Sequence, residues 1–168
     1  MTANAIDLIT FAKTARPDLN DNQIRFLKRT QNEQRVFEVW PRRSGKSVVG
    51  NLLLLHKLIE GQEQVAFIGS KNAMVWHECE SIIKSHQELL PDVKIERKSR
   101  GEFIIKERQH LFGWTYDSLA QGKLRGRTAL DHIHMDEYKL NVPRNFRDEW
   151  ESVIKYKGDR ITGLSTRV

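Results

Sequence analysis

Apolar positions along the chain recur with two spacings, one typical of helices and one typical of strands. The helical spacing predicts a first helix over residues 3–14, a second one capped by Asn20 or Asp21, and further helices over residues 47–60, 72–90 and 145–156. Short apolar runs predict strands at residues 36–40, 65–68, 110–114, 132–135 and 161–164, and a hairpin with arms at 93–95 and 103–105. Because helices and strands alternate, we expect an α/β fold with a mostly parallel sheet covered on both faces.

The strand at residues 36–40 leads directly into a polar loop. The sequence from its last residue reads Trp40-Pro41-Arg42-Arg43-Ser44-Gly45-Lys46-Ser47, and a helix that is apolar almost all round follows. The usual phosphate-binding loop reads G-x-x-x-x-G-K-[ST], so Gly-Lys-Ser is kept while Trp40 replaces the first glycine. Backbone N–H groups and the helix dipole attract phosphates in such a loop. This context predicts ATP bound at Arg43, Ser44, Gly45, Lys46, Ser47 and Val48.

Two side chains of this loop have specific roles in the prediction. Lys46 would reach the β- and γ-phosphates, and the Ser47 hydroxyl would bind Mg²⁺. The alternative is a chance Gly-Lys-Ser in an ordinary turn, because the tripeptide alone is common.

A second motif, Ile133-His134-Met135-Asp136-Glu137, places two carboxylates at the end of a strand. Asp136 would hold Mg²⁺ through its water shell. Glu137 would orient and polarise the attacking water. A solvated turn after a strand is the alternative, but two motifs in this order make chance a poor explanation. A carboxylate directly after the metal-binding aspartate favours motor-type ATPases over small-molecule kinases.

Two histidines, His132 and His134, lie on one face of the same strand, where apolar residues are expected. One reading is a metal site, although no third ligand is close in the sequence. The other is a pair of histidines packed against a neighbouring element or partly solvated.

Composition narrows the class of protein. The 168 residues suggest one domain, and 39% apolar with 30% charged residues is typical of a globular chain. The net charge of +6 favours polyanionic partners only modestly. Cys79 is the one cysteine, which excludes an intramolecular disulfide and fits a reducing cytosol. The N-terminal segment is not typical of a secretory signal, because Asp7 interrupts its apolar stretch.

These motifs resemble the ATPase domain of viral terminase large subunits, the motors that pump double-stranded DNA into the heads of tailed phages. The resemblance spans residues 21–166. It is most specific where Leu124-Arg125-Gly126-Arg127-Thr128-Ala129 leads into Ile133-His134-Met135-Asp136-Glu137-Tyr138. It implies a P-loop NTPase fold of the ASCE, or RecA-like, type with an inserted β-hairpin. It also implies a single ATPase domain over residues 1–168, with residues 1–20 as a helical extension.

The resemblance implies roles for single residues. Gln23 is placed like a glutamine that reads adenine, and a solvated helix residue is the alternative. Arg42 matches a phosphate-loop arginine that acts on the γ-phosphate from within the subunit. Arg125 or Arg127 could be the finger offered to a neighbouring subunit's ATP. For each of these arginines the alternative is contact with a phosphate backbone or plain solvation. Ser165-Thr166 matches the coupling motif that senses hydrolysis, with an ordinary strand end as the alternative.

The resemblance also implies partners. These are double-stranded DNA held without sequence preference, the portal protein, the terminase small subunit and further copies in a homo-oligomeric ring. The site of action would be the host bacterial cytoplasm and, transiently, the portal vertex of the procapsid. Residues that could contact DNA phosphates, or be merely solvated, are Lys94, Arg97, Lys98, Arg100, Lys155 and Lys157. Terminase large subunits continue into a nuclease domain, which this chain lacks, so we expect no nuclease activity from it.

Two rival functions remain open. The chain could be another nucleic-acid motor, such as a helicase of a related superfamily, which would unwind a forked duplex. It could instead be a non-hydrolysing, nucleotide-dependent assembly module that docks a partner. The presence of Lys46, Asp136 and Glu137 argues against the second rival, because a protein that only binds nucleotide has no use for a water-activating glutamate.

Overall fold

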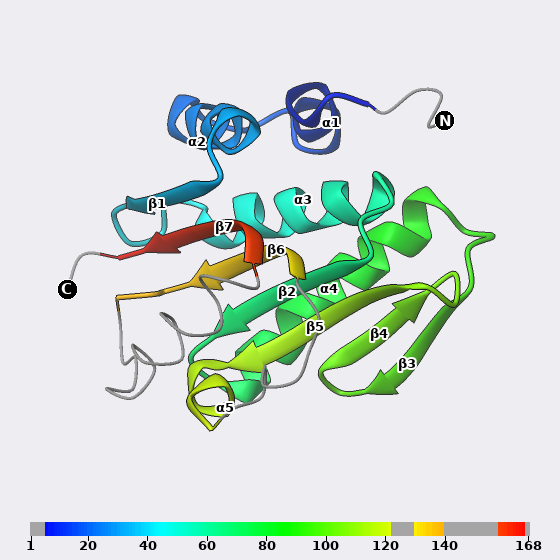
Figure 1. Cartoon of the computed structure of the whole chain (residues 1–168). Helices are drawn as coiled ribbons and strands as arrows, with labels where there is room; N and C mark the ends of the chain where they lie inside the picture. The colour runs from blue at the N-terminus through cyan, green and yellow to red at the C-terminus, as the bar shows by residue number, and fades with distance from the viewer. Residues whose placement is uncertain (1–5, 122–129, 140–157, 167–168) are drawn as a thin grey trace.

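A twisted sheet of seven strands organises the part of the chain that the computed structural model describes, residues 6–121, 130–139 and 158–166 (Figure 1). The strand order is β1-β7-β6-β2-β5-β4-β3. The strands are β1 (Arg35–Val39), β2 (Gln64–Gly69), β3 (Ile95–Ser99), β4 (Glu102–Ile105), β5 (Gln109–Thr115), β6 (Leu130–Asp136) and β7 (Gly158–Ser165). From β1 to β5 in this order all neighbours are parallel, whereas β5, β4 and β3 pair antiparallel. The predicted mostly parallel sheet and its hairpin are therefore confirmed.

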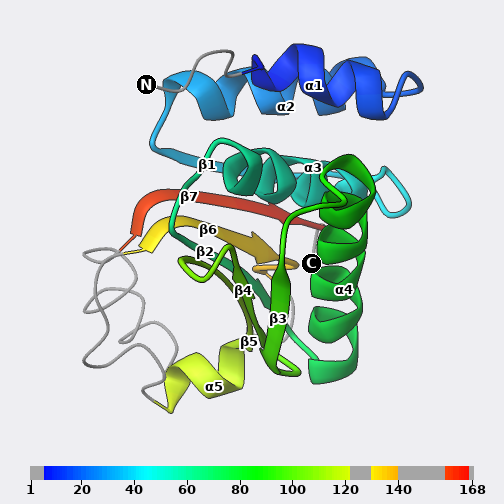
Figure 2. The same cartoon turned by 90° about the vertical axis from the view of Figure 1, so that its right-hand side faces the viewer.

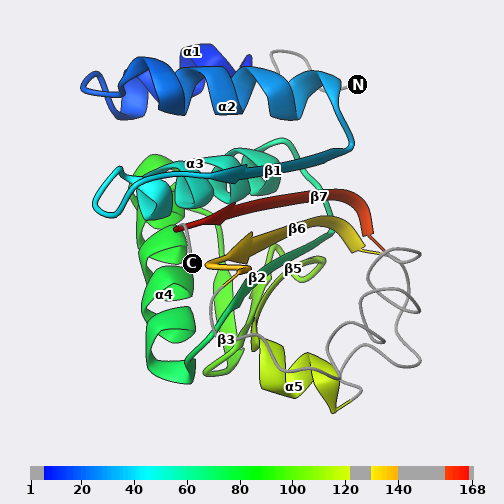
Figure 3. The same ribbon diagram turned by 90° about the vertical axis from the view of Figure 1, so that its left-hand side faces the viewer.

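Helices on one face of the sheet form two layers. They are α1 (Leu8–Ala15), α2 (Asp21–Asn32), α3 (Lys46–Ile59) and α4 (Asn72–Leu89), and a short helix, α5 (Tyr116–Ala120), follows β5. Helices α3 and α4 pack side by side on the sheet, and α1 and α2 lie over α3 and the β1 edge (Figures 2 and 3). None of the described helices is long and apolar enough to cross a membrane.

One predicted boundary needs correction, and one helix was not predicted. The first helix begins at Leu8 rather than at Ala3, because Asp7 Oδ2 accepts hydrogen bonds from the backbone N–H groups of Ile9 and Thr10 and caps the helix. Helix α5 was not predicted, since five residues are too few for a periodic pattern. The predicted helix over 145–156 falls outside the described residues, and the other predicted helices and strands are present.

Alternate residues of each central strand pack into different clusters on the two faces of the sheet. Val65 and Phe67 of β2 join the cluster beneath α3 and α4, whereas Ala66 and Ile68 join the cluster on the opposite face. All four side chains are at most 1% exposed. This double burial explains why the strand reads as an apolar run without polar alternation.

The two buried histidines of β6 face α3 and share one partner. His132 Nε2 lies 3.0 Å from Thr162 Oγ1, and His134 Nδ1 lies 2.8 Å from the same hydroxyl. Helix α3 crosses this point closely, because a Cβ on Gly50 would lie 2.6 Å from His134 Nε2. The histidines are therefore packed polar groups that join β6 to β7. Among the described residues, no group of three or more His, Cys, Asp or Glu side chains could hold a metal ion.

Burial keeps both rings neutral. It lowers the pKa of His134 to about 4 and, together with electrostatic interactions with His134, Lys57 and Arg160, lowers the pKa of His132 well below its ordinary range.

Protonation of His134 should therefore oppose folding. Its pKa is about 4 in the folded protein against an ordinary 6.5, so the unfolded chain binds the proton more readily between these values. The free energy of unfolding should be highest above the ordinary pKa. It should fall by up to about 3 kcal/mol as the pH drops to the folded pKa.

Urea unfolding of the wild type and of His134→Asn across this pH range measures the effect. Asparagine keeps a hydrogen-bonding atom near the position of Nδ1 but does not titrate. We expect a shallower loss of stability with acid in the variant. The same dependence on pH in both proteins would contradict the role assigned to His134.

Candidate nucleotide site

The loop between β1 and α3 folds back on its own backbone. Ser44 Oγ donates a hydrogen bond to the Pro41 carbonyl oxygen at 2.6 Å, and Lys46 Nζ donates to the same oxygen at 3.3 Å. Arg43 and Gly45 have φ angles of 58° and 80° and turn the chain into the helix. Gly45 is the N-cap of α3 and offers no side-chain acceptor. The first N–H groups of α3 and the helix dipole therefore make this end of the helix suited to an anion.

Trp40, which replaces the first glycine of the usual loop pattern, belongs to the core rather than to the loop. Its ring is 4% exposed and packs edge-on against Phe26, with 5.7 Å between ring centroids. Its backbone N–H donates to the Ser165 carbonyl oxygen at 2.8 Å, and its indole N–H donates to Glu38 Oε1 at 2.9 Å. The loop therefore begins at Pro41, one residue later than in the usual pattern, so the segment available to wrap around phosphates is one residue shorter.

Gln23 lies against the phosphate loop from the side of α2. Its Oε1 accepts the backbone N–H of Asn20 and its Nε2 donates to the Gly45 carbonyl oxygen at 3.2 Å, so both ends of the amide are in use. A Cβ on Gly45 would lie 2.2 Å from this Nε2, which together with the positive φ makes glycine necessary there. The predicted contact of Gln23 with adenine would require this amide to change partners.

A charged cluster around Glu38 holds α2 on β1. Arg25 Nη2 lies 3.1 Å from Glu38 Oε1, and Arg29 Nη1 lies 2.7 Å from Glu38 Oε2. Burial alone would raise the pKa of Glu38, but hydrogen bonds from Trp40, Arg29 and Arg25 outweigh it and hold the pKa below its ordinary value. Glu38 thus stays charged and fixes the helix that carries Gln23.

Asp136 ends β6 in a buried position beside the phosphate loop. Asp136 is 5% exposed, and the Tyr116 hydroxyl donates a hydrogen bond to the backbone carbonyl oxygen of Asp136 at 2.6 Å. Burial, and then the charges of Glu137 and Glu78, raise the pKa of Asp136 to about 7, although Lys46 acts in the opposite direction. The site therefore holds more negative charge than its one buried lysine balances.

Glu137 connects the phosphate loop to β7. Its φ is 50°, and its backbone N–H donates to the Leu164 carbonyl oxygen at 2.8 Å, which anchors the turn after β6. Its Oε1 lies 3.6 Å from Lys46 Nζ. The same carboxylate accepts the Thr166 hydroxyl at Oε1 and the Thr166 backbone N–H at Oε2, both at 3.0 Å. Lys46, Glu137 and Thr166 therefore form one connected chain of polar contacts.

Ser165 lies at the centre of the same edge. Its carbonyl oxygen accepts the Trp40 backbone N–H, and its hydroxyl oxygen accepts the backbone N–H of Lys139 at 3.1 Å. Ser165 is fully buried. The predicted coupling pair, Ser165-Thr166, thus contacts both the start of the phosphate loop and the segment after the acidic pair.

Only two of the predicted arginines, Arg42 and Arg43, lie in the part of the chain that the structure describes. Arg42 is exposed and lines a cavity of about 520 Å³ with Thr166, beyond the end of β1. Arg43 is also exposed. Arg125 and Arg127 lie outside the described residues. Which arginine acts on a phosphoryl group stays a prediction.

The basic hairpin lies on the far side of α4 from α3. Arg97 pairs with Glu80 and lies over the Phe103 ring, and Arg100 lies 5.2 Å from the centroid of the Trp76 ring. Both arginines are thus held in place by α4 and β4. Lys94 and Lys98 are exposed, and Lys155 and Lys157 lie outside the described residues.

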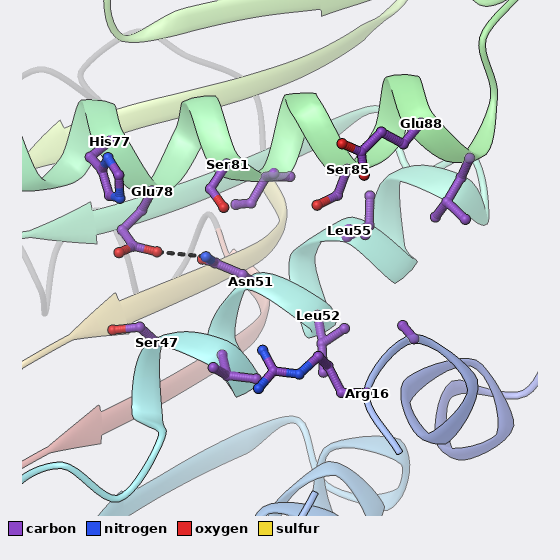
Figure 4. Close-up of a pocket in the computed structure, with 14 residues that line it drawn as sticks. Arg16, Ser47, Asn51, Leu52, Leu55, His77, Glu78, Ser81, Ser85 and Glu88 are labelled. Carbon is purple, nitrogen blue, oxygen red and sulfur yellow. Dashed lines mark hydrogen bonds between the residues drawn. The ribbon is translucent and has the colours of Figure 1, made fainter. Parts of the chain in front are cut away.

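The donor set at this edge fits a divalent cation. Ser47 is exposed on the first turn of α3, with its hydroxyl open to a ligand (Figure 4). Asp136 and Glu137 bring two carboxylates, and Lys46 is already engaged by Glu137. Mg²⁺ in proteins uses one or two carboxylates plus the phosphates of its nucleotide, which matches Ser47 and Asp136 as the residues that would hold it. Val48 is half-buried behind them.

Sequence reasoning missed four side chains of this region: Glu38, Asn51, Glu78 and Tyr116. Each acts through a contact with a distant segment. Glu38 carried a weak signal, as a charged residue in an otherwise apolar strand. Asn51 carried another, as a polar residue in a helix that is apolar almost all round.

Comparison with solved structures confirms the class of fold. The large terminase ATPase domain of Thermus phage P74-26 matches with a TM-score of 0.70 at 17% identity, over 90% of this chain and 66% of that chain. The large terminase of bacteriophage HK97 matches with a TM-score of 0.68 at 14% identity, over 98% and 38%. The UvsW helicase of bacteriophage T4 matches with a TM-score of 0.62 at 16% identity, over 87% and 51%.

The chain therefore has the P-loop ATPase fold shared by phage large terminases and related helicases, and it is similar to both at the level of the fold. It spans about two thirds of the P74-26 domain and a smaller share of the other two proteins. No model of a known protein family matches the sequence, and no curated protein matches it.

The buried charge of Asp136 should reduce stability when no ligand is bound. Its pKa is about 7 in the folded protein against an ordinary 3.8, so the folded protein binds the proton more tightly and stability falls as the pH rises between these values. At slightly alkaline pH, Asp136→Asn should raise the free energy of unfolding of the ligand-free protein. The gain should be on the order of 2–4 kcal/mol and should vanish near the ordinary pKa.

Chemical unfolding at the two ends of this pH range, with Asp92→Asn as the control, measures the gain. Asp92 is exposed, so its substitution should leave stability nearly unchanged. Loss of stability in Asp136→Asn at alkaline pH would show that the carboxylate is not strained in the ligand-free protein.

Proposed function

We propose that this chain is the ATP-hydrolysing motor domain of a phage terminase large subunit, which drives double-stranded DNA into procapsids. The observation that carries the proposal is the connected chain from Lys46 through Glu137 to Thr166. It joins a phosphate-binding lysine, a water-activating carboxylate and the end of a neighbouring strand. A protein that only bound nucleotide would not need this connection.

Phosphate binding would redistribute the partners of Lys46. In the ligand-free site its ammonium group contacts the Pro41 carbonyl oxygen and Glu137. The β- and γ-phosphates carry more charge than either partner, and the N–H groups at the start of α3 would attract them to the same loop, so Lys46 would turn to them. Ser44, bonded to Pro41, keeps the loop in shape. Mg²⁺ held by Ser47 and Asp136 would neutralise charge on the β- and γ-phosphate oxygens.

Glu137 would then act on water. Once Lys46 has moved away, the carboxylate is free to contact a water, and its two oxygens are held in place by the hydrogen bonds from Thr166. Oxygen Oε1 could accept a proton from a water that attacks the γ-phosphorus atom in line. The bond between the γ-phosphorus and the β–γ bridging oxygen would break, so that ADP keeps this oxygen and inorganic phosphate carries the water oxygen. The proton would stay on Glu137 until it is released to solvent.

Hydrolysis would be transmitted through β7. A change in charge or orientation at Glu137 alters the two hydrogen bonds to Thr166, and Ser165 next to it is bonded to both Trp40 and Lys139. Movement at this edge therefore reaches the segments on either side of it. An arginine completes the site in the proposal: Arg42 from within the subunit, or Arg125 or Arg127 from a neighbour in a ring.

The partners of the proposed motor follow from its class. Duplex DNA would be held through phosphates, for which the exposed Lys94 and Lys98 of the hairpin region are candidates. The portal protein, the terminase small subunit and further copies of the chain complete the assembly. The protein would act in the host bacterial cytoplasm and at the portal vertex of the procapsid.

A second candidate is a helicase-like translocase. The observation in its favour is the likeness of the fold to the T4 UvsW helicase, with a TM-score of 0.62. Strand separation of a forked duplex, driven by ATP, would distinguish a helicase from a packaging motor, because a packaging motor moves on intact duplex.

Hydrolysis by Glu137→Gln provides the direct test. We expect the wild type to hydrolyse ATP, faster with linear duplex DNA. Glu137→Gln should bind ATP with similar affinity but lose about 100-fold or more in kcat, because glutamine cannot accept the proton. Steady-state phosphate release and equilibrium binding of ATP measure the two quantities.

The matched control is Glu88→Gln, which makes the same chemical change at an exposed position of α4. It should keep wild-type kcat. A Glu137→Gln variant that still turns over ATP at the wild-type rate would rule out the proposed role, and a wild type that binds no ATP would rule out the proposed function.

A further inference from the structure

A groove between α3 and α4 opens next to the phosphate loop (Figure 4). It encloses about 400 Å³ and begins at Ser47. Its floor is apolar, whereas the wall from α4 presents a polar row: His77, Glu78, Ser81, Ser85 and Glu88. The end of this row nearest Ser47 carries a carboxylate, Glu78, that the proposed mechanism has not used.

Glu78 is held rather than free. Asn51 Nδ2 donates a hydrogen bond to Glu78 Oε2 at 2.6 Å. Asn51 follows Ser47 by one helical turn, so the two side chains share a face of α3. Figure 4 shows the Glu78 and Asn51 side chains directed toward each other, in the groove that Ser47 also lines. The carboxylate is thereby fixed on the wall of the groove that contains the hydroxyl expected to bind Mg²⁺.

A polar atom at this point lacks a partner. Asn51 Oδ1 is buried and accepts no hydrogen bond from any residue that the structure describes. A buried acceptor without a donor costs free energy, and an ordered water is its usual partner. Glu78 Oε1 also has no hydrogen bond among the contacts found in the described residues. The Asn51–Glu78 pair thus keeps two oxygen acceptors available to a bound water or to the water shell of a cation.

The electrostatics at this edge point to a cation. Glu78 interacts with Asp136 across the site, and Asp136 and Glu137 are neighbours in the chain. The ammonium group of Lys46 lies 3.6 Å from Glu137 and is needed for phosphates when nucleotide binds. Asp136 thus has two further carboxylates and one lysine within electrostatic range, and a divalent cation would balance this excess of negative charge.

We propose that Glu78, fixed by Asn51, is a positioning residue for the Mg²⁺ of the nucleotide site, which it reaches through a water of the metal's coordination shell. This inference rests on the proposed function. Mg²⁺ loses its waters reluctantly and keeps several of them, so a carboxylate outside the direct ligands can still orient it. Glu78 is suited to this outer position because one of its oxygens is already bonded to Asn51.

The test compares Glu78→Gln with Glu88→Gln, which lies on the same helix and the same groove wall but far from Ser47. Glutamine can still accept the hydrogen bond from Asn51, so the fold should survive. Binding of a fluorescent N-methylanthraniloyl ATP is measured over a range of Mg²⁺ concentrations and in EDTA. Phosphate release is measured over the same Mg²⁺ range.

Loss of an outer-shell partner of a metal weakens metal affinity by about 10–100-fold. We therefore expect Glu78→Gln to need at least about 10-fold more Mg²⁺ for half-maximal binding and hydrolysis. Its affinity for the nucleotide in EDTA, and its kcat at saturating Mg²⁺, should stay near wild type. Asn51→Ala, which releases Glu78, should shift the Mg²⁺ dependence in the same direction by a smaller factor. Glu88→Gln should not shift it.

Other outcomes overturn the inference. An unchanged Mg²⁺ dependence in Glu78→Gln would remove Glu78 from the metal site while leaving the proposed function intact. Loss of kcat at saturating Mg²⁺ with unchanged Mg²⁺ affinity would assign Glu78 to the chemistry instead. Failure of the wild type itself to bind nucleotide at any Mg²⁺ concentration would contradict the proposed function, which separates the two failures.

Discussion

The geometry of the nucleotide site depends on how the Glu137 carboxylate is held. Lys46 contacts it from the phosphate loop, and Thr166 donates two hydrogen bonds to it from the end of β7. A carboxylate next to Asp136 in a buried setting is costly to keep charged unless such partners stabilise it. Because the partners come from segments far apart in the sequence, a change at one of them reaches the others. Binding of phosphate at Lys46 is the simplest such change.

Polar contacts on both sides of the site hold the elements next to Lys46, Glu137 and Thr166 in place. On one side, Glu38 fixes α2, and α2 presses Gln23 against the Gly45 carbonyl oxygen. On the other, the Thr162 hydroxyl joins β7 to His132 and His134 of β6. The strands that carry the acidic pair and the coupling pair are therefore tied together by side chains as well as by their backbone ladder.

Local patterns predicted much of this structure, and long-range contacts account for what they left open. The helices, the strands and the Gly-Lys-Ser loop follow from periodicity and from residues adjacent in the chain. The two histidines of β6 are polar and therefore did not fit the pattern of a buried strand. Their partner, Thr162, could not be recognised from the sequence because it lies about 30 residues away on β7. The Glu78–Asn51 bond likewise joins residues 27 positions apart. Helical periodicity indicates that each side chain lies on a polar or apolar face, but not which residue faces it.

Determination of the structure with Mg²⁺ and a non-hydrolysable ATP analogue tests the central claim most directly. The account predicts phosphates cradled by the loop from Pro41 to Ser47, with the Lys46 ammonium group moved from Glu137 to the β- and γ-phosphates. Glu137 should then face the γ-phosphate while Thr166 still donates to it. An analogue bound elsewhere, or phosphates in the loop with Lys46 still on Glu137, would contradict the account.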